Sequence, residues 1–91
     1  VVQRDSAFVY GQMTLAKASL LSNQADKAAE RLLTVIRLQP KSLDAHLLLA
    51  EVREQQGDKT GAIALYQTCL QLTGLKELKK ALEERIQELS K

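Results

Sequence analysis

Apolar residues recur along this chain with the spacing of α-helices. Between residues 43 and 52, and again between 62 and 72, they return every three or four positions and place one apolar stripe on one side of a helix. Ala, Leu, Glu, Lys and Gln, which are strong helix formers, dominate the composition. The pattern predicts an all-α fold. Its first four helices are expected at residues 6–22, 25–38, 43–56 and 59–72.

Polar residues and glycine mark the predicted helix ends. Ser42 suits the N-cap of the third helix, because its hydroxyl can accept a hydrogen bond from a free backbone N–H. Gly57 offers the left-handed residue that ends this helix, and Asp58 suits the next N-cap. Asn23 takes the part of Gly57 in the earlier half, because asparagine tolerates the left-handed region. The cap of the opening helix is expected at Asp5 or Ser6.

The sequence repeats itself at an interval of 34 residues. Core-type and turn positions match at this shift, whereas surface positions differ, as when Lys17 falls on Glu51. A period in this range predicts a helical solenoid. The matched pairs are Leu15 with Leu49, Ala16 with Ala50, Asn23 with Gly57, Ala28 with Ala62, Leu32 with Tyr66, Ile36 with Leu70 and Leu38 with Leu72. The paired alanines predict close helix crossings, since larger side chains push helix axes apart.

The C-terminal stretch predicts a fifth helix of a different kind. One narrow apolar stripe runs along it, and the charged residues around it suggest the ion pairs Lys79–Glu83 and Lys80–Glu84. The stripe consists of Leu75, Leu78, Leu82, Ile86 and Leu89. Glutamates occupy the positions where the repeat needs a small residue, so no further helix can pack closely there. We expect a capping helix that covers the last helix pair with a polar outer face.

This pattern resembles the tetratricopeptide repeat (TPR). The residues that match are Leu49-Ala50, Gly57-Asp58, Ala62-Ile63, Tyr66 and Leu70 in the second unit, and Leu15-Ala16, Ala28, Leu32, Ile36 and Pro40 in the first. The usual large aromatic residue early in the first helix is replaced by Gln12 and His46. The resemblance implies one domain, residues 1–91, folded as a right-handed α-solenoid. Its parts are repeat 1 at about 9–42, repeat 2 at about 43–74 and the capping helix at about 75–90.

Composition and charge exclude several classes of function. The net charge of +2 is too small and too dispersed for nucleic-acid binding, and it argues against the RNA-binding relatives of helical-pair repeats. No apolar run approaches the ~20 residues of a membrane-spanning helix, so membrane insertion is not expected. A single cysteine excludes an internal disulfide and a four-cysteine metal site.

No group of residues predicts catalysis or a cofactor. The sequence GDKTG at residues 57–61 follows a helix and lacks the spacing of a phosphate-binding loop, so a turn between helices is favoured. His46 is the only histidine and has no second ligand placed near it, which favours a packing role over that of a general base or ligand. Cys69 lies on an inner stripe, where a buried thiol is inert. We expect no catalytic residue, metal site or cofactor.

A stack of helix pairs leaves a concave face lined by the first helix of each pair. The TPR resemblance implies that the groove is lined by Tyr10, Met13, Lys17, Leu20, Leu21, Asp44, Leu47, Glu51, Glu54 and Gln55. Its first half is apolar with one cation and its second half acidic around one leucine, which suits a peptide with apolar anchors at one end and Lys or Arg at the other. We expect Lys17 and Glu51, which occupy equivalent sites, to pair.

The groove does not suit a chaperone C-terminal tail. The clamp that holds such tails in other TPR domains needs several basic residues and asparagines, and the corresponding sites here are Met13, Lys17 and Leu48. The sequence therefore predicts a protein- or peptide-binding module of a larger multi-repeat protein. The alternative is a structural role without a groove ligand. In that case Val1, Val2, Phe8 and Val9 form an apolar face that packs on upstream repeats or makes a homodimer.

Overall fold

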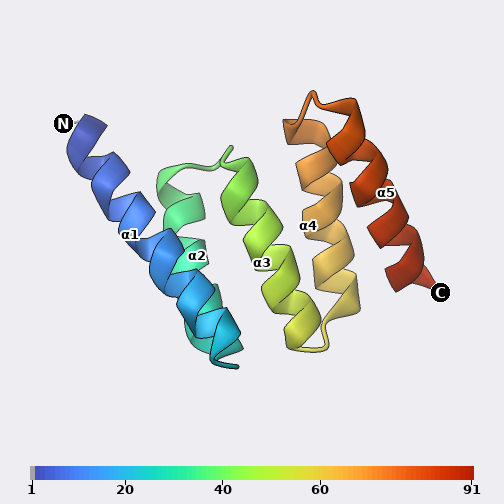
Figure 1. Cartoon of the computed structure of the whole chain (residues 1–91), viewed down its shortest axis with the longest axis horizontal. Helices are drawn as coiled ribbons and strands as arrows, with labels where there is room; N and C mark the ends of the chain where they lie inside the picture. The colour runs from blue at the N-terminus through green and yellow to red at the C-terminus, as the bar shows by residue number, and fades with distance from the viewer. Residues whose placement is uncertain (1) are drawn as a thin grey trace.

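The computed structural model describes the backbone of residues 2–91 and the side chains of residues 7–91. Five helices follow one another, and residues 2–91 contain no strand. They are α1 (Val2–Leu21), α2 (Ala25–Leu38), α3 (Leu43–Gln55), α4 (Lys59–Leu72) and α5 (Lys76–Ser90). Figure 1 shows successive helices running in opposite directions, from α1 at one end of the molecule to α5 at the other. Each helix packs on the next, which confirms the predicted all-α solenoid.

The predicted boundaries of the second, third and fourth helices agree with the structure to within one residue. The first helix was expected to begin at residue 6, but α1 begins at Val2. The prediction that Asp5 or Ser6 caps this helix is therefore wrong, since both residues lie inside it. The physical reason is local, because residues 2–8 contain no glycine or proline that would stop a helix.

The two turns within the helix pairs use the predicted residues. Asn23 has a φ of 63° and Gly57 a φ of 80°, so both adopt the left-handed conformation. The hydroxyl of Ser42 accepts a hydrogen bond from the N–H of Ala45, which confirms the cap of α3. At the start of α4, Asp58 Oδ1 accepts from the N–H of Gly61 at 2.9 Å. These bonds satisfy backbone donors that the first turn leaves without a partner.

The core consists of two apolar seams that meet at α3. One joins α1, α2 and α3, and the other joins α3, α4 and α5. The four alanines of the repeat, Ala16, Ala28, Ala50 and Ala62, are fully buried, as close helix crossings require. Val9 was expected on an exposed apolar face but packs against Val35 and Ala45, so that prediction is wrong. Phe8 is half exposed, and the side chains of Val1 and Val2 lie outside the described residues.

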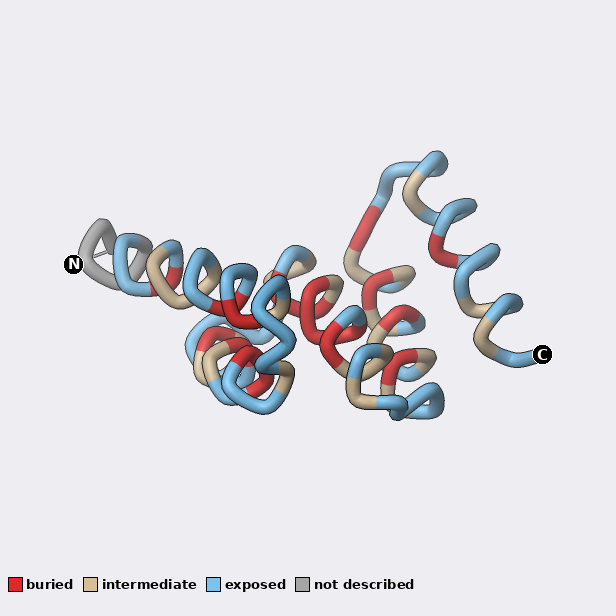
Figure 2. The backbone as a smooth tube through the Cα atoms, turned by 60° about the horizontal axis from the view of Figure 1, so that its bottom comes forward, coloured by how far each residue is buried: buried red, intermediate tan, exposed pale blue. Residues whose placement is uncertain are grey.

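Helix α5 covers the downstream seam through the predicted stripe, with one exception. Leu82 is almost fully buried, and Leu78, Ile86 and Leu89 pack partly against the same cluster. Leu75 is exposed instead, because it precedes the first turn of α5 and serves as its N-cap residue. Figure 2 shows that most of α5 is exposed, whereas buried residues concentrate on the inner sides of the other helices.

The ion pairs predicted within α5 are not formed. Neither Lys79–Glu83 nor Lys80–Glu84 is made, and the two ion pairs found among residues 7–91 both involve Arg85. One joins Arg85 to Glu88 within α5, and the other joins it to Glu54 on α3. A charged side chain on the capping helix therefore makes a tertiary contact that helical spacing alone does not predict.

Candidate functional site

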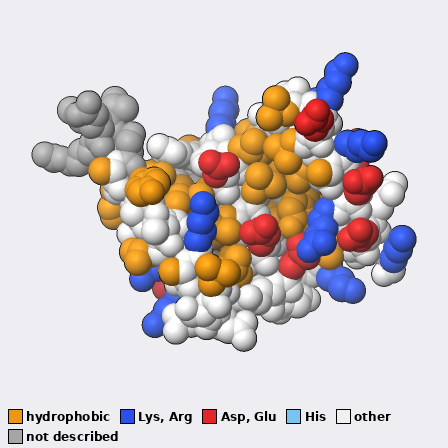
Figure 3. All heavy atoms as spheres, in the orientation of Figure 1, with side chains coloured by type: hydrophobic (Ala, Val, Ile, Leu, Met, Phe, Trp, Pro, Cys, Tyr) orange, Lys and Arg blue, Asp and Glu red, His pale blue; other side chains and the backbone are white. Residues whose placement is uncertain are grey.

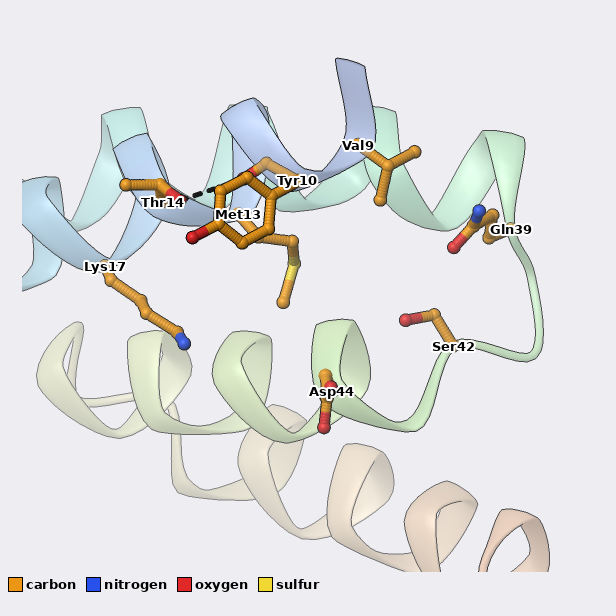
Figure 4. A pocket seen from close by; sticks show the side chains of 8 residues that line it. All are labelled: Val9, Tyr10, Met13, Thr14, Lys17, Gln39, Ser42 and Asp44. Carbon is orange, nitrogen blue, oxygen red and sulfur yellow. Dashed lines mark hydrogen bonds between the residues drawn. The ribbon is translucent and has the colours of Figure 1, made fainter. Parts of the chain in front are cut away.

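A cleft lies between α1 and α3, the first helices of the two repeats. Its volume is ≈ 390 Å³. The lining residues are Val9, Tyr10, Met13, Thr14, Lys17, Gln39, Ser42 and Asp44. Figure 4 shows Met13 and Lys17 extending from α1 toward α3, with Asp44 on the facing helix. Apolar, cationic and anionic groups thus border a single hollow.

The predicted residues of α1 differ in how far they remain accessible. Tyr10 and Leu21 have 75% and 88% of their surface exposed, and Lys17 is exposed as well. Met13 and Leu20 are partly buried and pack against the core. Leu21 ends α1 and does not line the cleft of Tyr10 and Lys17. The structure therefore brings together three of these five residues, namely Tyr10, Met13 and Lys17.

Glu51 stands on α3 without an ion-pair partner among residues 7–91. The expected Lys17–Glu51 pair is not made within 4.0 Å, so this prediction is wrong, and both side chains are exposed. Burial raises the pKa of Glu51 above its ordinary value, and the neighbouring charge of Glu54 raises it further. The positive charges of Arg85 and Lys17 act in the opposite direction and lower this pKa. A carboxylate in this setting favours the approach of a cation.

Glu54, also predicted for the groove, binds two other side chains of the protein. Its carboxylate accepts a hydrogen bond from the hydroxyl of the buried Tyr66 and two from the guanidinium of Arg85, at 2.6 and 3.2 Å. Burial, together with the Glu54 carboxylate, raises the pKa of Tyr66, so its hydroxyl stays protonated and keeps donating. The hydrogen bond to Glu54 raises the pKa of Arg85. Glu54 thereby joins α3, α4 and α5.

Gln55, the last residue of α3, links this helix to the C-terminal end of α1. Its Nε2 donates to the backbone carbonyl of Leu20 at 3.2 Å, which satisfies one of the last carbonyls of α1. Nearby, Gln56 bonds to both Arg53 and Asp26, each at 2.8 Å. These amides link α3 to the hairpin before it. These bonds could not be predicted from the sequence, because they depend on side chains outside the matched positions of the repeat.

His46 and Cys69 occupy the packing positions predicted for them. His46 is buried, and its Nδ1 lies 2.7 Å from the carbonyl of Ser42. A carbonyl can only accept, so Nδ1 carries the proton and donates. Cys69 is fully buried, and burial raises the pKa of its thiol to about 11, which keeps it neutral and unreactive at physiological pH.

The described part of the chain offers no cluster of three metal-type ligands. Among the same residues, no helix is both long enough and apolar enough to span a bilayer.

Several cleft residues were not predicted from the sequence, namely Val9, Thr14, Gln39 and Ser42. Gln39 and Ser42 lie in the loop between the repeats, where the helical register that located the other positions does not apply.

Stacked antiparallel hairpins of this kind define the α-solenoid class of interaction scaffolds. The tetratricopeptide repeat model matches residues 13–74, well over half of the chain, and the protein belongs to the tetratricopeptide repeat family. Repeats of this family are non-catalytic and mediate protein–protein interaction or scaffolding. A comparison with curated proteins gives no significant match.

Proposed function

We propose that the chain binds a segment of a partner protein in the groove that runs across α1 and α3. The observation that carries this proposal is the cleft of ≈ 390 Å³, which is bordered by the exposed side chains of Tyr10, Lys17 and Asp44. An exposed aromatic ring and two opposite charges on one cleft offer an apolar contact and two polar ones to the same ligand. Such mixed surfaces give affinity through the aromatic anchor and orientation through the charges.

Peptide display on the immobilised protein, followed by titration of a selected peptide, tests this proposal. Tyr10→Ala and Lys17→Glu should each weaken binding by about tenfold, which corresponds to the loss of about 1.4 kcal/mol. Leu33→Ala and Lys27→Glu are matched controls, because both residues are exposed on α2 and lie outside the cleft. Equal affinity of all four variants and the unsubstituted protein would reject the groove as the binding site.

A second role is supported by the outer face of the first repeat. Leu15 is 46% exposed, whereas its equivalent in the second repeat, Leu49, is 3% exposed because the preceding hairpin covers it. Together with Phe8, it leaves an apolar surface where the repeat pattern places another hairpin. We propose that a second copy of the chain covers this face. Light scattering over a range of concentrations should then show a dimer, and Leu15→Glu should yield a monomer without loss of helicity.

A further inference from the structure

A second hollow lies beside α5, and every residue that lines it belongs to α5 or directly precedes that helix. In the described chain no Cα atom of α3 comes within 8 Å of one in α5, although both helices pack on α4. Figure 3 shows hydrophobic side chains gathered over this part of the molecule, with charged groups around them. We call this surface the α3–α5 trough, and its apolar residues are Leu43, Leu47, Leu75, Leu78 and Ala81.

The two walls of the trough are apolar for reasons of helical spacing. Leu43 and Leu47 lie one turn apart on α3 and are only partly buried, so each keeps surface open to solvent. Leu75, which precedes α5, and Leu78 and Ala81 on α5 border a hollow of ≈ 710 Å³, larger than the cleft beside α1. The ion pair between Arg85 and Glu54 spans the gap between α5 and α3.

Acidic residues dominate the rim. On α3, Asp44 and Glu51 are exposed and have no ion-pair partner among residues 7–91. On α5, Glu77 lines the hollow, and Glu84 lies two turns further along the same side of the helix. Two cations lie on the same side of α5, Lys76, which lines the hollow, and the exposed Lys80 one turn further, so the four acidic residues outnumber them. The rim therefore has a net negative charge.

We infer that the α3–α5 trough holds a basic peptide segment whose bulky apolar side chains contact Leu47 and Leu78 and whose Lys or Arg side chains meet Glu51 and Glu77. This inference rests on the proposed function, because it assigns a ligand chemistry to the downstream half of the same groove. The apolar walls supply contact area, and the acidic rim selects against peptides of negative charge. A ligand long enough to cross α3 would occupy the cleft and the trough together.

The test selects ligands from a library of random displayed peptides with the unsubstituted protein. The selected pool should be enriched in Leu, Ile or Phe together with Lys or Arg. Fluorescence anisotropy then measures the affinity of one selected peptide for each variant. Leu47→Ala and Glu77→Lys should each raise the Kd by about tenfold or more.

Matched controls separate these effects from general ones. Leu33→Ala repeats the apolar truncation on α2, and Glu83→Lys repeats the charge reversal on the opposite side of α5. Both should leave the Kd within about twofold. Circular dichroism establishes that each variant folds. As a rescue, a peptide in which Glu replaces Lys should bind Glu77→Lys more tightly than it binds the unsubstituted protein.

Two outcomes distinguish the failure of this inference from that of the proposed function. If Tyr10→Ala and Lys17→Glu weaken binding but Leu47→Ala and Glu77→Lys do not, the trough is not a subsite and the cleft alone binds the peptide. If none of the four variants affects binding, or if the library yields no ligand, both proposals are overturned. A selected pool without enrichment of basic residues contradicts the inferred ligand chemistry.

Discussion

The two gaps between neighbouring groove helices are built differently. Between α1 and α3 the backbones approach each other, and the Gln55–Leu20 hydrogen bond joins the helix ends. Between α3 and α5 the backbones stay apart, and the Glu54–Arg85 ion pair is the polar link. The two repeats pack on each other through the apolar positions that they share, as in the cluster that joins α1, α2 and α3. The capping helix α5 is held instead by its own apolar stripe and by one ion pair to α3. This difference leaves the second gap wider and more apolar.

Deleting α5 should have the largest effect, because α5 covers the whole downstream seam. Removal of residues 75–91 exposes the cluster around Ala62 and Cys69, and the burial of Leu82 alone contributes about 1.5–3 kcal/mol. We expect residues 1–74 to lose helicity and to aggregate, as measured by circular dichroism and light scattering. If this shorter chain stays soluble and fully helical, with the same oligomeric state as the full chain, the capping role assigned to α5 is wrong.

Replacing a buried alanine by leucine in each hairpin tests whether the helices of both hairpins cross equally closely. Ala28→Leu and Ala62→Leu should each lower the free energy of unfolding by about 1–3 kcal/mol, because both sites are fully buried between crossing helices. Ala64→Leu is the matched control, since Ala64 is exposed on the same helix as Ala62. Urea titrations that show equal stability for the two Ala→Leu changes on α4 would contradict the close crossing.

Substitutions of Glu54 and Gln55 compare how much the two polar links contribute to the free energy of unfolding. Glu54→Ala leaves the buried Tyr66 hydroxyl without its acceptor and should lower the free energy of unfolding by about 1–3 kcal/mol. Gln55→Ala removes one exposed hydrogen bond and should lower it by about 0.5–1.5 kcal/mol. Adding Tyr66→Phe should reduce the penalty of Glu54→Ala, because no unpaired hydroxyl then remains. Additive effects in urea titrations of the double variant would show that the two side chains act independently.

The sequence predicted the fold well because the 34-residue register determines it. Equivalent residues of the two repeats take the same environment in the structure. Both Ala28 and Ala62 are fully buried, and both Asn23 and Gly57 have a positive φ. The start of α1 was not predicted, because no residue near position 6 stops a helix. Leu75 was assigned to the wrong environment, since a stripe pattern does not show where the first turn begins.

The candidate site was less predictable than the fold. Tyr10, Met13, Lys17 and Asp44 line one cleft, and their role in binding stays a prediction. Glu54 was predicted only as a groove residue, because its contact with Arg85 comes from the capping helix, 31 residues away and outside the repeat. The trough depends on the separation between α3 and α5, and a sequence pattern carries no information on that distance.

The smallest predicted effect concerns the charge of Glu51. Burial and the Glu54 charge raise its pKa in the folded state, so ionisation destabilises the fold at neutral pH and this penalty disappears below the unfolded pKa. Glu51→Gln should raise the Tm by about 1–2 °C at pH 7, and the gain should vanish below about pH 4. The effect is small because water screens the exposed side chain. A Tm gain that persists at low pH would point to a cause other than charge.

The most direct test of groove binding is a nuclear magnetic resonance titration of the ¹⁵N-labelled chain with a display-selected peptide. We predict chemical-shift changes at the amides of α1, α3 and α5 that border the cleft and the trough, including Lys17, Glu51 and Ala81. The amides of Leu33 and Gln67, on the second helices of the two repeats, should not shift. Changes confined to α2 and α4, with none on the groove helices, would contradict the account.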